Sequence, residues 1–185
     1  FNLKRAEDGD AEAQYLIYQA YNEGEGVEED RTIAREWLKK AADNGHVTAQ
    51  ALMGFDEIIR GNAAIGVEYW EKASAGGHLK AMHDLAELYR DGDCDVPMNK
   101  PRAIELFRKA ADAGYPEAMG SLGICYATGD GVAQDDYEAF RWFQLAAEKG
   151  EQYAQKNLGV SYRSGRGTTE NKALAVQWFE KAAEQ

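Results

Sequence analysis

The residues best suited to chemistry are three aspartates at alternate positions, Asp91, Asp93 and Asp95. Alternate carboxylates of this kind open an EF-hand calcium loop, which also needs Gly at its sixth position and Glu at its twelfth. In this chain those two positions hold Val96 and Arg102. We therefore interpret the segment as a solvated turn, and we expect neither a metal ion nor another cofactor.

The three histidines lack the converging partners that a catalytic or metal-binding site needs. His46 and His78 each follow a glycine at equivalent places, and His83 has Asp84 and Glu87 nearby in sequence. We find no nucleophile elbow, no pair of histidines on one helix face, and no Ser, His and Asp set that the sequence would bring together. We interpret all three as surface or interface histidines and expect no enzymatic activity.

The two cysteines, Cys94 and Cys125, are too few for a metal cluster or a disulfide framework. One disulfide could form between them if stacking brings the loop that holds Cys94 next to the helix that holds Cys125. The favoured alternative is a pair of reduced thiols, with Cys125 half-buried.

The composition excludes two classes of partner. Lys and Arg total 21 against 32 Asp and Glu, so the net charge of −11 opposes binding to nucleic acid or to an anionic membrane. No apolar run approaches the roughly 20 residues that a membrane helix requires, and the amino end has no signal-peptide layout. Residue 1 is Phe rather than Met, which is consistent with removal of a leader or an upstream domain.

Helical hairpins must position all these side chains. Between Gly114 and Gly150, residues four apart predict one face of a first helix, and residues three and four apart predict the apolar stripe of a second. The first set is Ala118, Leu122 and Tyr126, and the second is Ala139, Trp142, Phe143 and Ala146.

The loop between these helices combines a helix stop with a helix start. Gly129 accepts the left-handed backbone angles that close the first helix, and the Asp135 carboxylate can cap the second. Gly129 and Gly131 do not indicate a phosphate site, because no strand precedes them and no third glycine follows. Equivalent caps are expected at Asp30, Asn99 and Asn171.

The hairpin pattern recurs along the chain, with closing glycines at intervals of 36, 32, 37 and 36 residues: Gly9, Gly45, Gly77, Gly114 and Gly150. Such periods are typical of arrays in which each hairpin buries its apolar face by stacking on its neighbours. We therefore predict a single domain over 1–185. It comprises the end of a preceding helix at 1–9 and repeats at about 10–45, 46–77, 78–114, 115–150 and 151–185.

Two further features recur. A small residue that follows the large apolar one should let neighbouring helices approach closely, as at Gly54, Ala86, Gly123 and Gly159. The second helices carry large apolar pairs that we predict to be core: Trp37-Leu38, Tyr69-Trp70, Leu106-Phe107, Trp142-Phe143 and Trp178-Phe179. The second repeat is short, with Glu57 in place of Tyr, and a tight turn at 60–62 should replace its loop.

The motif A-x3-L-G-x2-Y-x2-G-x-G-V-x2-D-x3-A-x2-W-x3-A-A-x2-G, matched almost fully between Ala118 and Gly150, resembles the Sel1-like repeat family, which is related to the tetratricopeptide repeats. The resemblance covers nearly the whole chain. It implies an all-α fold, a right-handed α/α superhelix or solenoid of about five Sel1-like hairpins. The period and the G-x-G-V loop disfavour tetratricopeptide repeats themselves.

The resemblance also implies a function, because Sel1-like repeat proteins generally act as adaptors. We expect a scaffold that binds a protein partner, of the kind found in bacterial envelope processes, virulence or toxin neutralisation. One alternative is a structural segment of a longer array that self-associates through its uncapped ends. A remote alternative is an enzyme acting on cell-wall material or small molecules. The location, periplasmic, secreted or cytoplasmic, stays open.

The first helices are expected to line the concave groove of the array and to bind the partner there. Counting from the first Ala of each repeat, positions plus three and plus six should face this groove. They are Leu16, Gln19, Leu52, Phe55, Asp84, Glu87, Ser121, Ile124, Asn157 and Val160. The alternative is that the plus-six side chains pack against the neighbouring first helix.

Overall fold

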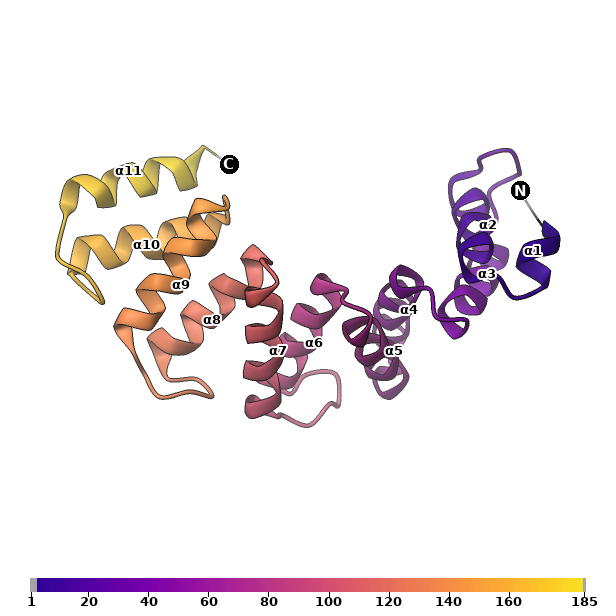
Figure 1. Cartoon of the computed structure of the whole chain (residues 1–185), viewed down its shortest axis with the longest axis horizontal. Helices are drawn as coiled ribbons and strands as arrows, with labels where there is room; N and C mark the ends of the chain where they lie inside the picture. Colours follow the sequence, from indigo (N-terminus) through magenta and orange to yellow (C-terminus); the bar gives the residue numbers. More distant parts are fainter. Residues whose placement is uncertain (1–2, 185) are drawn as a thin grey trace. The chain divides into compact units, whose positions relative to one another are not determined.

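The computed structural model describes residues 3–184, which form α-helices and no strand. After the short helix α1 (Leu3–Glu7), the helices come in pairs that follow the predicted repeats (Figure 1). The pairs are α2 (Ala11–Glu23) with α3 (Arg31–Asp43), α4 (Val47–Ile59) with α5 (Ala63–Ala75), α6 (Leu79–Asp91) with α7 (Lys100–Asp112), α8 (Pro116–Thr128) with α9 (Asp136–Glu148), and α10 (Gln152–Ser164) with α11 (Lys172–Ala183). The predicted all-α solenoid fold is confirmed.

The helices form two compact units, each of which is described by itself. Unit 1 contains the residues up to Met82 together with Cys94–Val96, and unit 2 contains His83–Asp93 together with the residues from Pro97 onward. The single domain expected over the whole chain stays a prediction.

The predicted helix boundaries are confirmed by their caps. Gly129 ends α8 with a left-handed φ of 74°, and its N–H donates to the carbonyl of Cys125. Asp135 begins α9, and its carboxylate accepts the N–H groups of Tyr137 and Glu138, each at 3.0 Å. The expected caps Asp30, Asn99 and Asn171 accept first-turn N–H groups in the same way.

Two histidines have a structural role that the sequence analysis missed. His46 Nδ1 accepts the N–H of Ala49 at 3.1 Å, and His78 Nδ1 accepts the N–H of Ala81 at 3.1 Å. Both therefore cap the first helix of a repeat, as the Asp10 side chain does in α2. The equivalence of the two positions reflects this capping role.

The second glycine of the G-x-G loop makes room for the preceding hairpin. A Cβ on Gly131 would stand 3.0 Å from Ile104 Cγ1 of α7. A Cβ on Gly167 would overlap the carbonyl oxygen of Asp136 at the start of α9. The first glycine of the loop thus ends a helix, whereas the second permits one repeat to stack on the repeat before it.

The small residue after the large apolar one has a different neighbour. A Cβ on Gly123 would lie 2.7 Å from Phe143 Cδ1, and a Cβ on Gly159 would lie 2.7 Å from Phe179 Cε1. In each case the ring comes from the second helix of the same hairpin. The close approach expected from the sequence is therefore between the two helices of one hairpin.

Glu57, which replaces the usual tyrosine, holds the short turn of the second repeat. Its side chain is 8% exposed, accepts the Asn62 amide at 2.8 Å, and forms an ion pair with Arg35. The predicted tight turn joins α4 directly to α5, since only residues 60–62 separate the two helices.

The core of each unit is built mainly from the predicted apolar positions. In unit 1, one cluster contains Leu38, Ala41, Ala42, Ala49, Met53 and Tyr69. In unit 2, the fully buried side chains include Leu85, Phe107, Leu122, Cys125 and Leu158. Four of the aromatics predicted to be core, Trp37, Trp142, Trp178 and Phe179, are only half-buried.

The two cysteines differ in their surroundings. The structure has both as reduced thiols, Cys94 exposed and Cys125 fully buried rather than half-buried. Burial raises the pKa of Cys125 to about 11, so this group stays a neutral thiol at ordinary pH. The disulfide between them, the less favoured alternative, stays a prediction.

Thiol titration with an aromatic disulfide reagent is expected to detect one thiol in the folded chain and two after denaturation. The thiolate is the form that reacts with the reagent. At Cys125, burial blocks access of the reagent to the sulfur, and the raised pKa keeps the thiol protonated. A Cys94→Ser variant serves as the control and should leave no reactive thiol in the folded state. If the folded and unfolded wild-type chain both show none until a reductant is added, the two cysteines are joined by a disulfide.

The described residues contain neither a candidate metal cluster nor a candidate membrane span. Within residues 3–184, no group of three His, Cys, Asp or Glu side chains is arranged to hold a metal ion. None of the helices in this part of the chain combines the length and the apolarity that crossing a membrane requires.

Candidate binding surfaces

The ten side chains predicted to face a groove are all at least partly exposed. Leu52 and Phe55 line a pocket of unit 1. Five others line two adjoining pockets of unit 2: Glu87, Ser121, Ile124, Asn157 and Val160. Leu16, Gln19 and Asp84 lie outside these three pockets. Binding of a partner by any of the ten stays a prediction.

The pocket of unit 1, which we call the Phe55 surface, has a volume of about 300 Å³. Its apolar side is formed by Tyr18 of α2 together with Leu52 and Phe55 of α4. Phe55 is 56% exposed, whereas Leu52 and Tyr18 pack against the core of the unit. The arginines Arg31 and Arg60 lie at its polar side.

The charges beside the Phe55 surface are fixed by ion pairs. Arg35 Nε donates to Asp56 at 2.6 Å, and a guanidinium nitrogen of Arg35 pairs with Glu57. The hydrogen bond to Asp56 raises the pKa of Arg35, although burial partly opposes this shift. Asp56 also accepts from Arg60 at 3.0 Å. The rim therefore presents ordered guanidinium groups around an open apolar floor.

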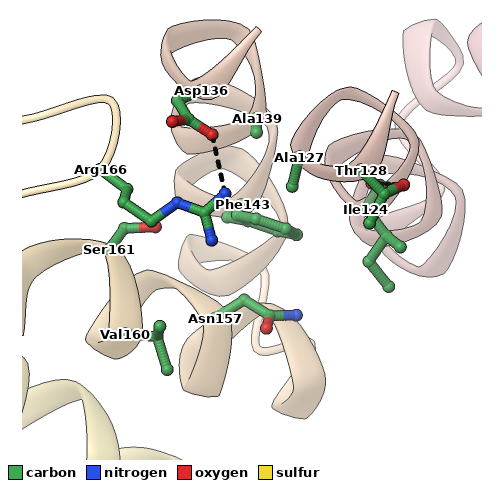
Figure 2. A pocket seen from close by; sticks show the side chains of 10 residues that line it. All are labelled: Ile124, Ala127, Thr128, Asp136, Ala139, Phe143, Asn157, Val160, Ser161 and Arg166. Carbon is green, nitrogen blue, oxygen red and sulfur yellow. Dashed lines mark hydrogen bonds and ion pairs between the residues drawn. The ribbon is translucent and has the colours of Figure 1, made fainter. Parts of the chain in front are cut away.

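The first pocket of unit 2, the Phe143 groove, lies between α8, α9 and α10 and has a volume of about 160 Å³ (Figure 2). The ring of Phe143 projects into its centre, with Ile124 on one side and Val160 on the other. Arg166 reaches across its edge to Asp136, at 3.2 Å. The floor is thus apolar, and one end is closed by an ion pair.

The second pocket of unit 2, the His83 pocket, has a volume of about 280 Å³ and adjoins the Phe143 groove, with which it shares Ile124 and Asn157. Its lining residues belong to the first helices of three successive repeats, α6, α8 and α10, and include the residue that caps α10. They are His83, Glu87, Glu117, Gly120, Ser121, Ile124, Glu151, Tyr153 and Asn157.

A hydrogen-bond network joins α6 to α8 within the His83 pocket. His83 Nε2 lies 3.1 Å from Ser121 Oγ, and Ser121 Oγ donates to Glu87 Oε1 at 2.9 Å. Glu87 is also paired with Arg90, at 2.5 Å. His83 Nδ1 lies 3.4 Å from Asp84.

This network corrects one interpretation from the sequence, because the fold does bring a Ser, a His and an Asp together. The arrangement differs from that of a hydrolase in two respects. The single hydroxyl proton of Ser121 is donated to Glu87, so it is not held by His83. Ser121 also lies inside α8, where backbone N–H groups are used by the helix and are not available to an oxyanion. The network orders the pocket wall.

Several residues at the rim of the His83 pocket were not predicted from the sequence. Glu117 and Tyr153 each lie one position before the first Ala of their repeats, and Glu151 is the cap of α10. Positions minus one, plus three and plus six are spaced by four and three residues, so they share one helix face. Extending the predicted stripe by one turn toward the helix start would have found Glu117 and Tyr153.

Comparison with known proteins identifies related sequences over most of the chain. The profile described as the Sel1 repeat matches residues 11–46, 49–78, 79–115, 116–151 and 152–185. The Sel1-repeat-containing protein YjcO of Escherichia coli K12 is 30% identical over 148 residues, which are 74% of this chain and 61% of that protein. The chitin synthase regulator SKT5 of Saccharomyces cerevisiae is 32% identical over 146 residues, 75% of this chain and 21% of that protein.

Solved structures agree with these matches. A Sel1 repeat protein from Oxalobacter formigenes is 30% identical with a TM-score of 0.88, covering 96% of this chain and 74% of that one. The protective antigen c5321 of uropathogenic Escherichia coli is 32% identical with a TM-score of 0.89, covering 98% of this chain and 39% of that one. This chain is thus shorter than each of these relatives.

Proposed function

Because the chain belongs to the Sel1 repeat family, which typically mediates protein–protein interaction, we propose that it is an adaptor that binds a polypeptide partner on the surface of its first helices. Sel1 repeat proteins are generally non-enzymatic scaffolds. The observation that carries the proposal is the Phe55 surface, where a large aromatic side chain that lines a pocket is exposed to solvent.

The Phe55 surface has the composition of a protein-binding site. Phe55 is 56% exposed, so its ring can still lose water-accessible apolar area to a partner. Aromatic side chains and arginines are enriched at protein–protein interfaces, and the polar rim of an interface surrounds an apolar centre. Arg31 and Arg60 can add hydrogen bonds at the edge of the same contact.

The names of relatives support a regulatory role for such an adaptor. One relative is described as a regulator of chitin synthase and another as a protective antigen of a pathogen. We accordingly propose that the partner is a protein whose activity or assembly this chain controls, in a bacterial envelope, virulence or toxin-neutralising setting. The chain spans only part of each of these relatives.

Replacing Phe55 with glutamate is expected to reduce partner capture at least about tenfold, because the charge would have to be desolvated on binding. The test uses the chain as bait and quantifies captured proteins by mass spectrometry. Leu52 packs against the core, so it is left unchanged.

The matched control is Ile65→Glu, because Ile65 is 47% exposed but lies on α5, a second helix. This variant should capture the same proteins as the wild-type chain. The circular dichroism spectra of the wild-type chain, the Phe55→Glu variant and the Ile65→Glu variant should be identical. Equal capture by the Phe55 and Ile65 variants would contradict binding at the Phe55 surface.

A second candidate function is self-association through the last helix. In α11 only Ala175 is buried, and Val176 is 54% exposed. The exposed surface of α11 can be covered by a further repeat or by another copy of the chain. Light scattering over a dilution series tests this, since a constant monomer mass would exclude self-association, and a mass that rises with concentration would support it.

A further inference from the structure

We propose that the His83 pocket of unit 2 binds an arginine side chain of the polypeptide partner. This inference rests on the proposed adaptor function and names the chemistry that one part of the partner must carry. The pocket lies on α6, α8 and α10, the helices to which the proposed function assigns binding.

Gly120 makes the space that a long side chain would enter. It is one of the residues lining the pocket, and a Cβ there would stand 3.0 Å from Glu151 Oε2. A larger residue at this position would therefore fill the gap between α8 and the start of α10. The Ile124 side chain, 40% exposed, lies nearby in the lining and offers an apolar contact for the methylene groups of an arginine.

The pocket carries carboxylates without a matching cation. Glu117 and Glu151 form no ion pair with any described residue, whereas Glu87 is neutralised by Arg90. Glu151 accepts the N–H groups of Tyr153 and Ala154, so its position is fixed by the start of α10. Those N–H groups are consequently not available to an anionic ligand. A guanidinium group can donate to carboxylates on two helices at once.

An open aromatic ring accompanies these carboxylates. Tyr153 is 72% exposed at the pocket rim, the largest exposed fraction among the large apolar side chains of the described residues. A planar guanidinium stacks on an aromatic face and is held there by the ring quadrupole. The ring and the carboxylates together favour arginine over the point charge of lysine.

The polar wall of the pocket keeps this geometry in place. His83 is packed between the rings of Phe107 and Tyr115, each with a centroid 5.6 Å away, and it is bonded to Ser121. The net charge of −11 adds a long-range attraction for a basic segment. Association with the arginine-bearing partner should accordingly slow as salt is added.

The test is an NMR titration of the full chain with the peptide acetyl-Gly-Ile-Arg-Gly-amide. Controls replace the arginine with citrulline, which has the same shape without the charge, or with lysine. We expect the arginine peptide to shift the amide signals of Gly120, Ser121 and Tyr153, and to bind about tenfold more tightly than the citrulline peptide and more tightly than the lysine peptide.

Variants locate the effect. Glu117→Gln and Tyr153→Leu should each lower the affinity for the arginine peptide about fivefold. The first variant removes a negative charge, and the second removes an aromatic face. Glu180→Gln, an exposed glutamate of the second helix α11, should change nothing.

Equal binding of the arginine, citrulline and lysine peptides would overturn the proposal, as would shifts that avoid the pocket or no shifts at millimolar peptide. None of these results would bear on capture at the Phe55 surface, which is in the other unit. Loss of capture by Phe55→Glu and failure of the arginine peptide are therefore separate outcomes.

Discussion

Replacing Gly167 with alanine is expected to lower the free energy of unfolding by about 3 kcal/mol, because a left-handed non-glycine residue and a steric overlap each destabilise. Gly167 has a φ of 70°, and its added Cβ would stand 2.6 Å from the carbonyl carbon of Asp136. Backbone atoms at the start of a helix cannot move away without shifting the preceding hairpin. Urea unfolding followed by circular dichroism measures the change.

Gly165 provides the matched control for this prediction. It has the same φ of 70° in the same loop, but its nearest neighbour to an added Cβ is the Glu170 nitrogen at 3.4 Å. Gly165→Ala should therefore lower the free energy of unfolding by only about 1 kcal/mol, the cost of a left-handed backbone conformation at a non-glycine residue. Equal losses in the two variants would show that the second glycine does not serve hairpin stacking.

Replacing Phe107 with alanine is expected to lower the free energy of unfolding by about 3–5 kcal/mol, through lost burial and the cavity left behind. Phe107 is fully buried in unit 2, and its ring contacts that of His83. Loss of the ring should also release His83, so amide signals around the His83 pocket should move even in the folded variant.

Phe55→Ala is the control for Phe107→Ala, because it removes the same side chain from a site that is 56% exposed. Its effect on stability should stay within about 0.5 kcal/mol. A similar loss in both variants would contradict the assignment of Phe107 to the core and Phe55 to the surface.

The sequence determines the hairpins because their signals are local. Gly129 and Asp135 act on helix ends that lie within a few residues, and the structure confirms both caps. The spacing of apolar residues likewise predicts which face of each helix is buried, and Leu122 and Leu158 on these faces are fully buried. These features require no knowledge of how one repeat meets the next.

Contacts between repeats could not be predicted in the same way. Ser121 and Glu87 were each assigned to the groove, but their hydrogen bond depends on the register in which α8 lies against α6. The overlap of Gly167 with Asp136 depends on the register of a loop and the preceding hairpin. A period in the sequence shows that hairpins stack, whereas it leaves the matching of individual side chains open.

Capping by His46 and His78 was missed for another reason. Ser, Thr, Asp and Asn are the preferred residues at helix starts, so the residue type of a histidine there does not indicate a cap. The position of these histidines does indicate one, because Asp10 and Glu151 follow a closing glycine in the same way and also cap a helix. Comparing the residue after each closing glycine would have indicated the role.

Site-specific photo-crosslinking tests the central claim, polypeptide binding by the first helices, most directly. A benzophenone amino acid replaces Phe55 on α4 or Tyr153 on α10, and for comparison Ile65 on α5 or Tyr137 on α9. All four positions are exposed. We predict that the same partner is crosslinked from the first-helix positions and not from the second-helix positions. Crosslinking confined to Ile65 and Tyr137 would contradict the account.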